Sequence, residues 1–321
     1  MTPIFEDYWE EACIVGFGSH AQSKIFPALR RSNIKSISLV STSYFGQFGA
    51  LTVYRSLECA LMRVKPKTLF IIASPPGVHF EQAHQILLAN FDVFIEKPAC
   101  LTEYHAGILS SVASKNGLIL AEMLMYLEYD IINNFFVSVS SALEDLSSIE
   151  FNFLVPALPK KSFRRLPGNS VAAFSDFACY PISFLLGCGL SFKNSVWVLA
   201  SETDIDVPLY KIKGYCDGVD IECTLGVANS YRNDVIVNYK NGSNSNFSPI
   251  FYGRNAERKF VNICELGIVD VQRHFLGNAF DKMFSKSRNF WSYNQNKRLK
   301  DLKEQSRMLE CLGKLIKPLE E

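Results

Sequence analysis

The stretch Cys13-Ile14-Val15-Gly16-Phe17-Gly18-Ser19-His20-Ala21 joins an apolar run, a glycine turn and the start of a helical pattern. A strand that leads through G-x-G-x-x-A into a helix is typical of dinucleotide-binding βαβ units. Gly16 allows a tight turn, Gly18 lets a pyrophosphate approach the backbone, and Ala21 lets helix and strand pack closely, while the N–H groups at the helix start would hold the phosphates. The motif alone also fits a glycine turn without a ligand, or the adenosyl part of S-adenosylmethionine. Its place in a βαβ unit favours a dinucleotide.

Apolar runs and helical patterns alternate through the first third of the chain. Strands are predicted over residues 12–16, 37–40, 68–73, 92–96 and 118–122, and helices over 19–29, 79–89 and 103–115. Pro27 is expected to bend the first helix, and Asn90 to take the left-handed conformation after the second. Strands that are apolar throughout are typical of a parallel sheet buried on both faces. We therefore predict an α/β domain with a doubly wound parallel sheet over residues 1–121.

After residue 122 the pattern changes to strands with one solvent-exposed face, in which apolar and polar residues alternate. Such strands are predicted over 149–155, 219–227, 233–239 and 259–264. One helix is predicted over 171–186, and an amphipathic helix over 297–317. We expect residues 122–321 to form a second domain of α+β type, with an open, mainly antiparallel sheet and a helix on one face.

The composition is that of a globular protein without a uniform charge. Of the 321 residues, 48% are hydrophobic and 20% are charged, and 33 Lys and Arg against 32 Asp and Glu leave a net charge of +1. The hydrophobic fraction excludes wholesale disorder. Because nucleic acids and anionic membranes are held by basic surfaces, the charge balance argues against both as partners. A small molecule is the expected ligand.

The cysteines and histidines show no pattern of a disulfide framework or a metal site. The nine cysteines are scattered and contain no CxxC pair, and the five histidines show no HxxxH spacing. No apolar run approaches the ~18 residues of a membrane span, and residues 1–11 lack the order of a signal peptide. We expect a cytoplasmic protein with reduced thiols and no metal.

The end of the second predicted strand bears on the choice of coenzyme. NAD enzymes usually place Asp or Glu there to hold the ribose hydroxyls, but this strand ends in Val40-Ser41-Thr42-Ser43. Without a carboxylate nothing repels a 2′-phosphate, and Ser41 and Thr42 could donate to one. However, no Arg or Lys follows between Ser41 and Ala50. The sequence predicts NAD or NADP and slightly favours NADP.

A lysine follows the predicted strand 92–96, in Glu96-Lys97-Pro98. Open α/β sheets bind ligands at the carboxyl ends of their strands. A lysine there can lie over a nicotinamide ring and hydrogen-bond a reacting hydroxyl group. An isolated Glu-Lys-Pro string is more typical of a solvated surface lysine, so its meaning depends on the other motifs.

Together the motifs resemble those of the glucose-fructose oxidoreductase/inositol dehydrogenase (Gfo/Idh/MocA) family over most of the chain. Three blocks carry the resemblance, in the family's order. They are residues 14–21 with Phe26-Pro27-Ala28-Leu29, residues 71–79 continuing through 93–102, and Asp176-Phe177-Ala178-Cys179-Tyr180-Pro181-Ile182. The resemblance implies an N-terminal Rossmann domain, a C-terminal open sheet and reversible NAD(P)-linked oxidation of an alcohol, often on a sugar. In relatives the bond that corresponds to Lys97–Pro98 is often cis.

The same resemblance implies that Lys97, Asp176 and Tyr180 form the catalytic set. Hydride transfer from a carbinol carbon leaves a hydroxyl proton that needs an acceptor, and the reverse reaction needs a donor. We expect Tyr180 to act as general acid and base, Lys97 to assist it and hold the substrate oxygen, and Asp176 to orient the substrate or Lys97. Asp176 and Tyr180 are four residues apart and share a helix face. Without the other blocks, Tyr180 would be more typical of a core aromatic beside Phe177 and Phe184.

Several positions depart from the family's pattern. Ser170-Val171-Ala172 replaces a glycine-rich lead-in to the aspartate, and Ser183 stands where a second aspartate is expected. The stretch Glu122-Met123-Leu124-Met125-Tyr126-Leu127 is similar to one in the dihydrodiol dehydrogenase-like branch, but Leu127 replaces its arginine. These changes indicate a less polar substrate or a shifted specificity, and they leave room for a loss of activity.

The resemblance also implies contacts with cofactor and substrate. Tyr126 and Arg165 are candidate substrate residues, although Arg165 fits a solvated basic loop with Arg164 equally well. His79 is expected to shape the nicotinamide site after the Ser74–Pro75 loop. The candidate cofactor-binding residues are Gly16, Gly18, Ser19, His20, Ala21, Ser41, Thr42, Ser74, Pro75, His79, Glu96 and Lys97.

The leading hypothesis is an NAD(P)-dependent oxidoreductase that acts on a hydroxyl or carbonyl group of a small, carbohydrate-like substrate. The alternative is a catalytically weak dinucleotide-binding regulatory or accessory protein on the same fold. Leu127 and Ser183 favour this alternative, and the catalytic set argues against it. A methyltransferase fits less well, because its chemistry requires neither the Glu-Lys-Pro string nor the Asp176/Tyr180 pair. Since relatives commonly pair through the open sheet, we also expect a homo-oligomer, dimer or tetramer, through the C-terminal sheet.

Overall fold

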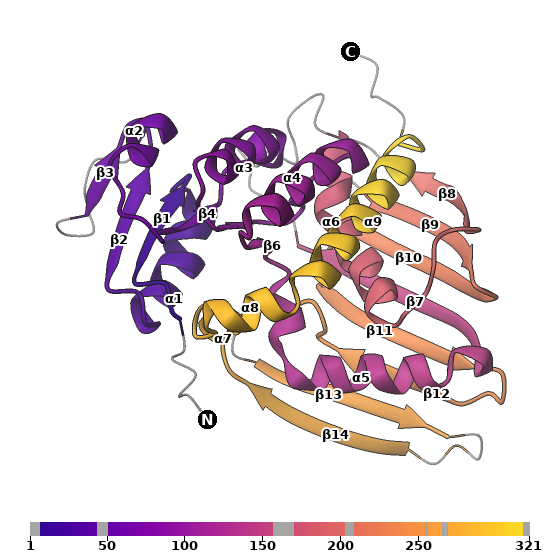
Figure 1. Cartoon of the computed structure of the whole chain (residues 1–321). Helices are drawn as coiled ribbons and strands as arrows, with labels where there is room; N and C mark the ends of the chain where they lie inside the picture. The colour runs from indigo at the N-terminus through magenta and orange to yellow at the C-terminus, as the bar shows by residue number, and fades with distance from the viewer. Residues whose placement is uncertain are drawn as a thin grey trace. The chain divides into compact units, whose positions relative to one another are not determined.

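The computed structural model describes residues 7–43, 51–156, 170–202, 209–253, 256–264, 267 and 269–316 (Figure 1). The chain divides into two compact units. The first consists of Met1–Leu124 with Phe280–Ser306, and the second of Met125–Ala279 with Arg307–Glu321.

The first unit contains a six-stranded parallel sheet in the order β3-β2-β1-β4-β5-β6. Its strands are β1 Glu11–Val15, β2 Ser36–Val40, β3 Thr52–Tyr54, β4 Leu69–Ile72, β5 Val93–Ile95 and β6 Leu120–Glu122. The strand order reverses between β1 and β4, which is the topological switch point where doubly wound sheets bind ligands. The apolar residues of β1, β4 and β5 are buried, as the continuous apolar runs required. The predicted doubly wound parallel sheet is confirmed.

The helices of the first unit begin and end largely where the sequence predicts. They are α1 Phe26–Arg31, α2 Leu57–Leu61, α3 His79–Leu88 and α4 Glu103–Asn116, with α3 and α4 side by side (Figure 1). Ser56 and Thr102 cap α2 and α4 with their hydroxyl groups. Asn90, with φ +66°, has the predicted left-handed conformation after α3. β3 and α2 were not predicted from the sequence.

Pro27 widens the first helix instead of only bending it. Residues Ala21–Ile25 form a π-helical turn that runs into α1, and the N–H of Phe26 donates to the carbonyl of Ala21. Proline lacks an N–H, and its ring crowds the preceding turn. A wider turn just before Pro27 accommodates both effects.

A C-terminal segment completes the first unit. It contains α7 Ala279–Phe284, α8 Arg288–Tyr293 and the first part of α9 Gln295–Gly313. The guanidinium group of Arg288 donates to Asp92 (2.7 Å), that of Arg31 to Asp281 (2.7 Å), and the Gln305 amide to Glu122 (2.6 Å). Leu299 and Leu302 pack into the core of the first unit. The predicted division into 1–121 and 122–321 therefore differs from the structure at residues 280–306. An amphipathic pattern indicates that one face of a helix is buried, but it does not indicate which domain covers that face.

The described part of the second unit forms an eight-stranded sheet in the order β14-β13-β12-β11-β7-β10-β9-β8. Its strands are β7 Leu146–Val155, β8 Val196–Glu202, β9 Leu209–Cys216, β10 Val219–Val227, β11 Arg232–Tyr239, β12 Asn244–Ser248, β13 Ala256–Ile263 and β14 Val269–Leu276. Neighbouring strands are antiparallel except β7 and β10, which run parallel. The predicted mainly antiparallel sheet is confirmed, although four of its strands (β8, β9, β12 and β14) were missed.

Helices cover one face of this sheet. In Figure 1, α5 Asp130–Ser141 and α6 Ser170–Gly187 lie on the same side of the strands. The ring of Phe184 on α6 packs edge-on against Phe136 on α5 and Phe151 on β7, with centroids 5.2 Å apart in each pair. α6 was predicted from the sequence, whereas α5 was not. Within the described residues, no helix is long and apolar enough to cross a bilayer.

Candidate active site

The glycine turn lies at the carboxyl edge of the parallel sheet. Gly16 has φ +87°, and a Cβ added to it would lie 2.8 Å from the backbone nitrogen of Ser74, so a side chain does not fit there. A Cβ added to Gly18 would meet no atom within 4 Å, which leaves room for a phosphate to approach the backbone. Ala21 is buried, as close packing of helix and strand requires. The turn therefore fits a dinucleotide.

Two histidines connect the loops at this edge. His20, at the start of the helix, places Nε2 2.9 Å from a carboxylate oxygen of Glu96. The buried ring of His79 lies with Nδ1 3.0 Å from the carbonyl oxygen of Pro98 and Nε2 2.8 Å from that of Ser74. A carbonyl oxygen only accepts, so the ring nitrogen that carries the proton donates to one of these carbonyls, while the other nitrogen lies against the second. His79 thus holds the loop after β4 against the loop after β5.

Lys97 is half-buried at the end of β5, beside two carboxyl groups. The backbone N–H of Lys97 donates to the carboxylate of Glu96 (3.3 Å), and the Lys97–Pro98 peptide bond is cis, as the family resemblance implied. Glu122, next to Ile95 in the register of β5 and β6, accepts the N–H of Ala99 (2.9 Å). The nearby charges act in opposite senses, since Lys97 lowers the pKa of Glu122 and Glu96 raises it.

Burial dominates the ionisation of Glu122. It raises the pKa of this carboxyl group from 4.5 to about 7, against the hydrogen bonds from Ala99 and Gln305 and the charge of Lys97. Glu122 was not among the predicted site residues. Its only sequence signal was its place at the end of a strand of the sheet that also carries Lys97.

The end of β2 meets an arginine that follows the neighbouring strand β3. Ser41 is buried and its N–H donates to the carbonyl of Tyr54 (3.0 Å), whereas Thr42 is exposed. The guanidinium Nη1 of Arg55 donates to the carbonyl of Ser41 (3.3 Å). The sequence analysis found no cation between Ser41 and Ala50. Arg55 reaches this place because β2 and β3 are parallel and pair Val40 with Tyr54.

Asp176 and Tyr180 lie on α6 in the second unit, and both are buried. The Tyr180 ring stacks on Phe251 and packs edge-on against Phe153, each at 5.0 Å between centroids. Its hydroxyl group lies 3.7 Å from the sulfur of Met125. These contacts fit the core-aromatic interpretation of Tyr180, and its catalytic role stays a prediction.

Tyr126 and Ser183 form a buried pair next to Tyr180. The hydroxyl groups of Tyr126 and Ser183 are 2.8 Å apart, and Ser183 donates to the carbonyl of Tyr180 (2.9 Å). Burial raises the pKa of the Tyr126 phenol well above its usual value, so the group stays neutral. Ser183, which stands in place of the expected aspartate, therefore forms its hydrogen bonds within the core of this unit. Tyr126 is fully buried, and its substrate contact stays a prediction.

The predicted site residues fall into two groups. The first unit brings together the glycine turn, Ser41, Ser74, His79, Glu96 and Lys97 at one sheet edge, and the second unit brings together Asp176, Tyr180 and Tyr126. That Lys97 meets Asp176 and Tyr180 stays a prediction. Arg164 and Arg165 lie outside the described residues. Within the described ranges, no three His, Cys, Asp or Glu side chains gather as a metal site.

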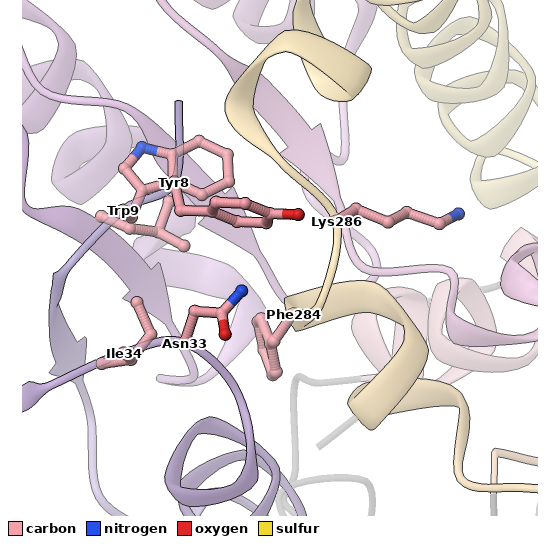
Figure 2. A pocket seen from close by; sticks show the side chains of 7 residues that line it. Tyr8, Trp9, Asn33, Ile34, Phe284 and Lys286 are labelled. Carbon is pink, nitrogen blue, oxygen red and sulfur yellow. The ribbon is translucent and has the colours of Figure 1, made fainter. Parts of the chain in front are cut away.

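The first unit also has a hollow that contains none of the predicted residues. It is lined by Tyr8, Trp9, Asn33, Ile34, Leu69, Phe284 and Lys286 (Figure 2). Trp9, Ile34 and Leu69 precede or begin β1, β2 and β4, so the hollow lies at the amino ends of these strands. Doubly wound sheets bind their cofactors at the other ends of the strands.

Comparison with protein families identifies the first unit. Residues 11–123 match the model of an oxidoreductase family with an NAD-binding Rossmann fold. This match confirms the prediction of NAD or NADP as the cofactor. No curated protein sequence matches the chain significantly.

Solved structures share the fold over nearly the whole chain. The 3-ketoreductase KijD10 from Actinomadura kijaniata, in complex with NADP and TDP-benzene, is 18% identical, with a TM-score of 0.76 over 94% of this chain and 96% of that one. An aldose-aldose oxidoreductase from Caulobacter crescentus is 12% identical (TM-score 0.74, 97% of both chains). The UDP-N-acetylglucosamine 3-dehydrogenase GnnA from Acidithiobacillus ferrooxidans is 13% identical (TM-score 0.72, 95% and 97%).

Proposed function

We propose that the chain is an NAD(P)-dependent dehydrogenase or reductase, because residues 11–123 match the model of an oxidoreductase family with an NAD-binding Rossmann fold. It transfers a hydride between the nicotinamide and a CH–OH or carbonyl group of a small, carbohydrate-like substrate. The main observation that supports the proposal is the position of Lys97. This half-buried lysine lies at the same sheet edge as the dinucleotide turn, beside the carboxyl groups of Glu96 and Glu122.

The residues of the chain supply binding and proton transfer. Gly16, Gly18 and the helix start hold the pyrophosphate, and the His79 bridge orders the two loops around the nicotinamide position. When bound, the nicotinamide supplies the hydride or accepts it. Lys97 holds the reacting oxygen, and Tyr180 gives its proton to the oxygen during reduction or takes the hydroxyl proton during oxidation. Asp176, one turn before Tyr180, orients the substrate or the ammonium group.

The substrate class rests on the similar structures and on the loss of charge near Tyr180. The three similar proteins are described as a 3-ketoreductase, an aldose-aldose oxidoreductase and a UDP-N-acetylglucosamine 3-dehydrogenase. Leu127 and Ser183 stand where the family resemblance implies an arginine and an aspartate. Both observations favour a carbohydrate-like substrate less polar than a free polyol.

A panel assay with a tyrosine variant tests the proposal. The protein is mixed with NADPH or NADH and with keto sugars linked to nucleotides, and separately with NADP or NAD and aldoses, and absorbance follows the reduced nicotinamide. We expect turnover with at least one sugar, and a fall of about 10²- to 10⁴-fold in Tyr180→Phe with unchanged NADPH affinity. Tyr104→Phe, at an exposed position on α4, is the matched control. Full turnover by Tyr180→Phe would show that another group moves the proton.

The alternative function predicts a different outcome of the same assay. Ser183 is bonded within the core of the second unit, where relatives carry a second aspartate, and this favours a binding protein that retains the fold. Such a protein would bind NADPH or NADH and turn over no member of the panel.

We also propose that two copies of the chain pair through the open face of the second unit's sheet. Exposed apolar residues gather at both edges of this face, with Val269, Val271 and Phe275 on β14, and Val196, Val198 and Tyr215 on β8 and β9. Phe275 is 78% exposed, and apolar patches of this kind mark protein interfaces.

Charged substitutions on β14 test the pairing. We expect light scattering to give at least twice the 36.2 kDa chain mass for the unaltered protein, and a mass near 36.2 kDa for the double variant Val271→Lys/Phe275→Glu. Val137→Lys, at an exposed apolar position on α5, is the control for added charge. A single-chain mass for the unaltered protein at micromolar concentration would exclude the dimer.

A further inference from the structure

We propose that the second unit binds a small monovalent anion, of the size of chloride, between Arg258 on β13 and His274 on β14. Neither the dinucleotide turn nor the catalytic set contributes a residue to this site, so it does not depend on the proposed function.

Arg258 is a buried cation without an opposite charge among the described residues. Its Nη2 donates to the carbonyl of Tyr252, whereas Nε and Nη1 are buried and have no hydrogen-bond partner. The carboxylates of Glu128 and Asp130, which flank Tyr129 in the chain, form no ion pair with this guanidinium group. Because an unpaired buried charge destabilises a fold strongly, a guanidinium group in such surroundings requires an anion.

Two tyrosine rings pack against the guanidinium group. Its central carbon lies 5.3 Å from the ring centroids of Tyr129 and of Tyr252. Burial lowers the pKa of Arg258, and the phenols of Tyr129, Tyr231 and Tyr252 act in the opposite sense. The face of a neutral ring attracts a cation but carries no net charge, and the Tyr129 hydroxyl group donates to the carbonyl of Gly277 (2.7 Å). The rings therefore hold the guanidinium group in place without neutralising it.

His274 brings a further nitrogen atom to the same side of the sheet. It lies directly opposite Arg258 in the register of β13 and β14. Opposite residues of an antiparallel pair leave the same face, with their Cβ atoms about 4.5–5.5 Å apart. The Nε2 atom of His274 is also buried and has no partner. When Nε2 carries the ring proton, the two side chains together present three N–H groups to one acceptor.

The site lies on the face of the sheet that α5 covers. Phe260, two residues after Arg258 on β13, packs against Phe135 of α5 with ring centroids 5.2 Å apart (Figure 1). Tyr129 directly precedes α5, so the guanidinium group lies near the start of this helix. The backbone N–H groups and the dipole at a helix start favour an anion. An ion bound there would fasten the β13–β14 hairpin, at the edge of the sheet, to α5.

The surroundings favour a halide over a larger or more highly charged anion. The unpartnered nitrogen atoms are buried, so the anion gives up its hydration shell when it binds. This loss is more costly for phosphate, which carries more than one charge near pH 7. A single negative charge also matches the single guanidinium group of Arg258.

Thermal unfolding of the full chain in different sodium salts tests the site. We expect the midpoint to rise by about 3–6 °C between about 1 and 100 mM sodium chloride, with the ionic strength held constant by sodium gluconate, whose anion is too large to enter. Sodium bromide should act as chloride does. Arg258→Met keeps the length and apolar stem of the side chain and removes its charge and its donors. In this variant chloride should shift the midpoint by less than about 1 °C.

Arg273→Met is the matched control, because it makes the same substitution next to His274. The guanidinium group of Arg273 is exposed and pairs with Glu257 (2.9 Å), so this variant should keep the full rise in chloride. A midpoint of the unaltered protein that does not respond to chloride, or an equal rise in Arg258→Met, would overturn the site.

Diffraction from crystals grown in sodium bromide locates the ion directly. The anomalous scattering of bromide should give a peak within hydrogen-bonding distance of Nη1 of Arg258 and Nε2 of His274. Because this measurement uses the unaltered protein, it decides the assignment even if Arg258→Met does not fold. A water molecule at this place, without anomalous signal, would show that the guanidinium group is solvated and not paired with an anion.

Discussion

Turnover is expected to fall by about 10²- to 10⁴-fold when Lys97 is replaced with methionine, while the affinity for NADPH changes only a few-fold. Methionine keeps most of the length and apolar stem of lysine and removes the charge and the N–H donors. The reacting oxygen gains negative charge as reduction proceeds, so the ammonium group stabilises the transition state more than the bound ground state. Loss of this group should therefore lower kcat more than it weakens binding.

The surroundings of Lys97 explain why the effect should be specific. Its charge lowers the pKa of the Glu122 carboxyl group, which burial raises to about 7. The hydrogen bond to Glu96 comes from the backbone N–H of Lys97, so the substitution leaves it in place. The cofactor contacts of the glycine turn do not pass through this side chain.

Single-turnover measurements of NADPH absorbance, together with the dissociation constant of NADPH, separate the two effects. Lys115→Met, at an exposed position in the last turn of α4, is the matched control. If Lys97→Met kept the turnover of the unaltered protein, the lysine would be a surface residue and the catalytic set would be wrong.

The second large effect is on stability. Asp92→Ala should lower the free energy of unfolding by about 3–5 kcal/mol, because it leaves the half-buried Arg288 without its anion and the buried N–H groups of Trp9 and Ile119 without their acceptor. The buried carboxylate of Asp92 accepts hydrogen bonds from Trp9 (2.8 Å), from the backbone of Ile119 (2.8 Å) and from two nitrogens of Arg288 (2.7 and 3.2 Å). Asp92 also raises the pKa of Arg288. This ion pair fastens α8 to the sheet of the first unit.

A second ion pair on the same segment provides the control. Asp281 on α7 pairs with Arg31 at 2.7 Å, but both side chains are more than one-third exposed. Asp281→Ala should therefore cost less than about 1 kcal/mol. Urea unfolding followed by tryptophan fluorescence measures both variants. Equal losses in the two variants would show that burial does not strengthen the Asp92 pair.

The sequence predicted the elements whose patterns are local. The apolar runs of β1, β4 and β5 lie between turns that are rich in Gly or end in Asn. No helical pattern within these runs competes with the prediction of a strand. Elements with mixed patterns were missed. In β14 most side chains are exposed on an edge strand, so no apolar alternation marks it, and the polar residues of β12 read as a loop.

The candidate site divides in the same way. The glycine turn and the Glu96-Lys97-Pro98 string were recognised because they are short motifs in the chain. Glu122 was missed because its importance comes from its neighbours Ala99 and Gln305, which are distant in sequence. The hydrogen bond between Tyr126 and Ser183 joins residues far apart in the sequence, so no local pattern indicated it, and the substrate contact of Tyr126 stays a prediction.

By itself, the sequence determined which chemical groups the sheet edge carries, because strand, turn and helix propensities act over a few neighbouring residues. Only the tertiary structure decided which distant groups meet. Parallel pairing of β2 with β3 brings Arg55 to Ser41, and the buried Asp92 brings the C-terminal segment back to the first unit. The physical reason is that strand register and helix docking depend on the packing of surfaces far apart in the chain, which no local pattern records.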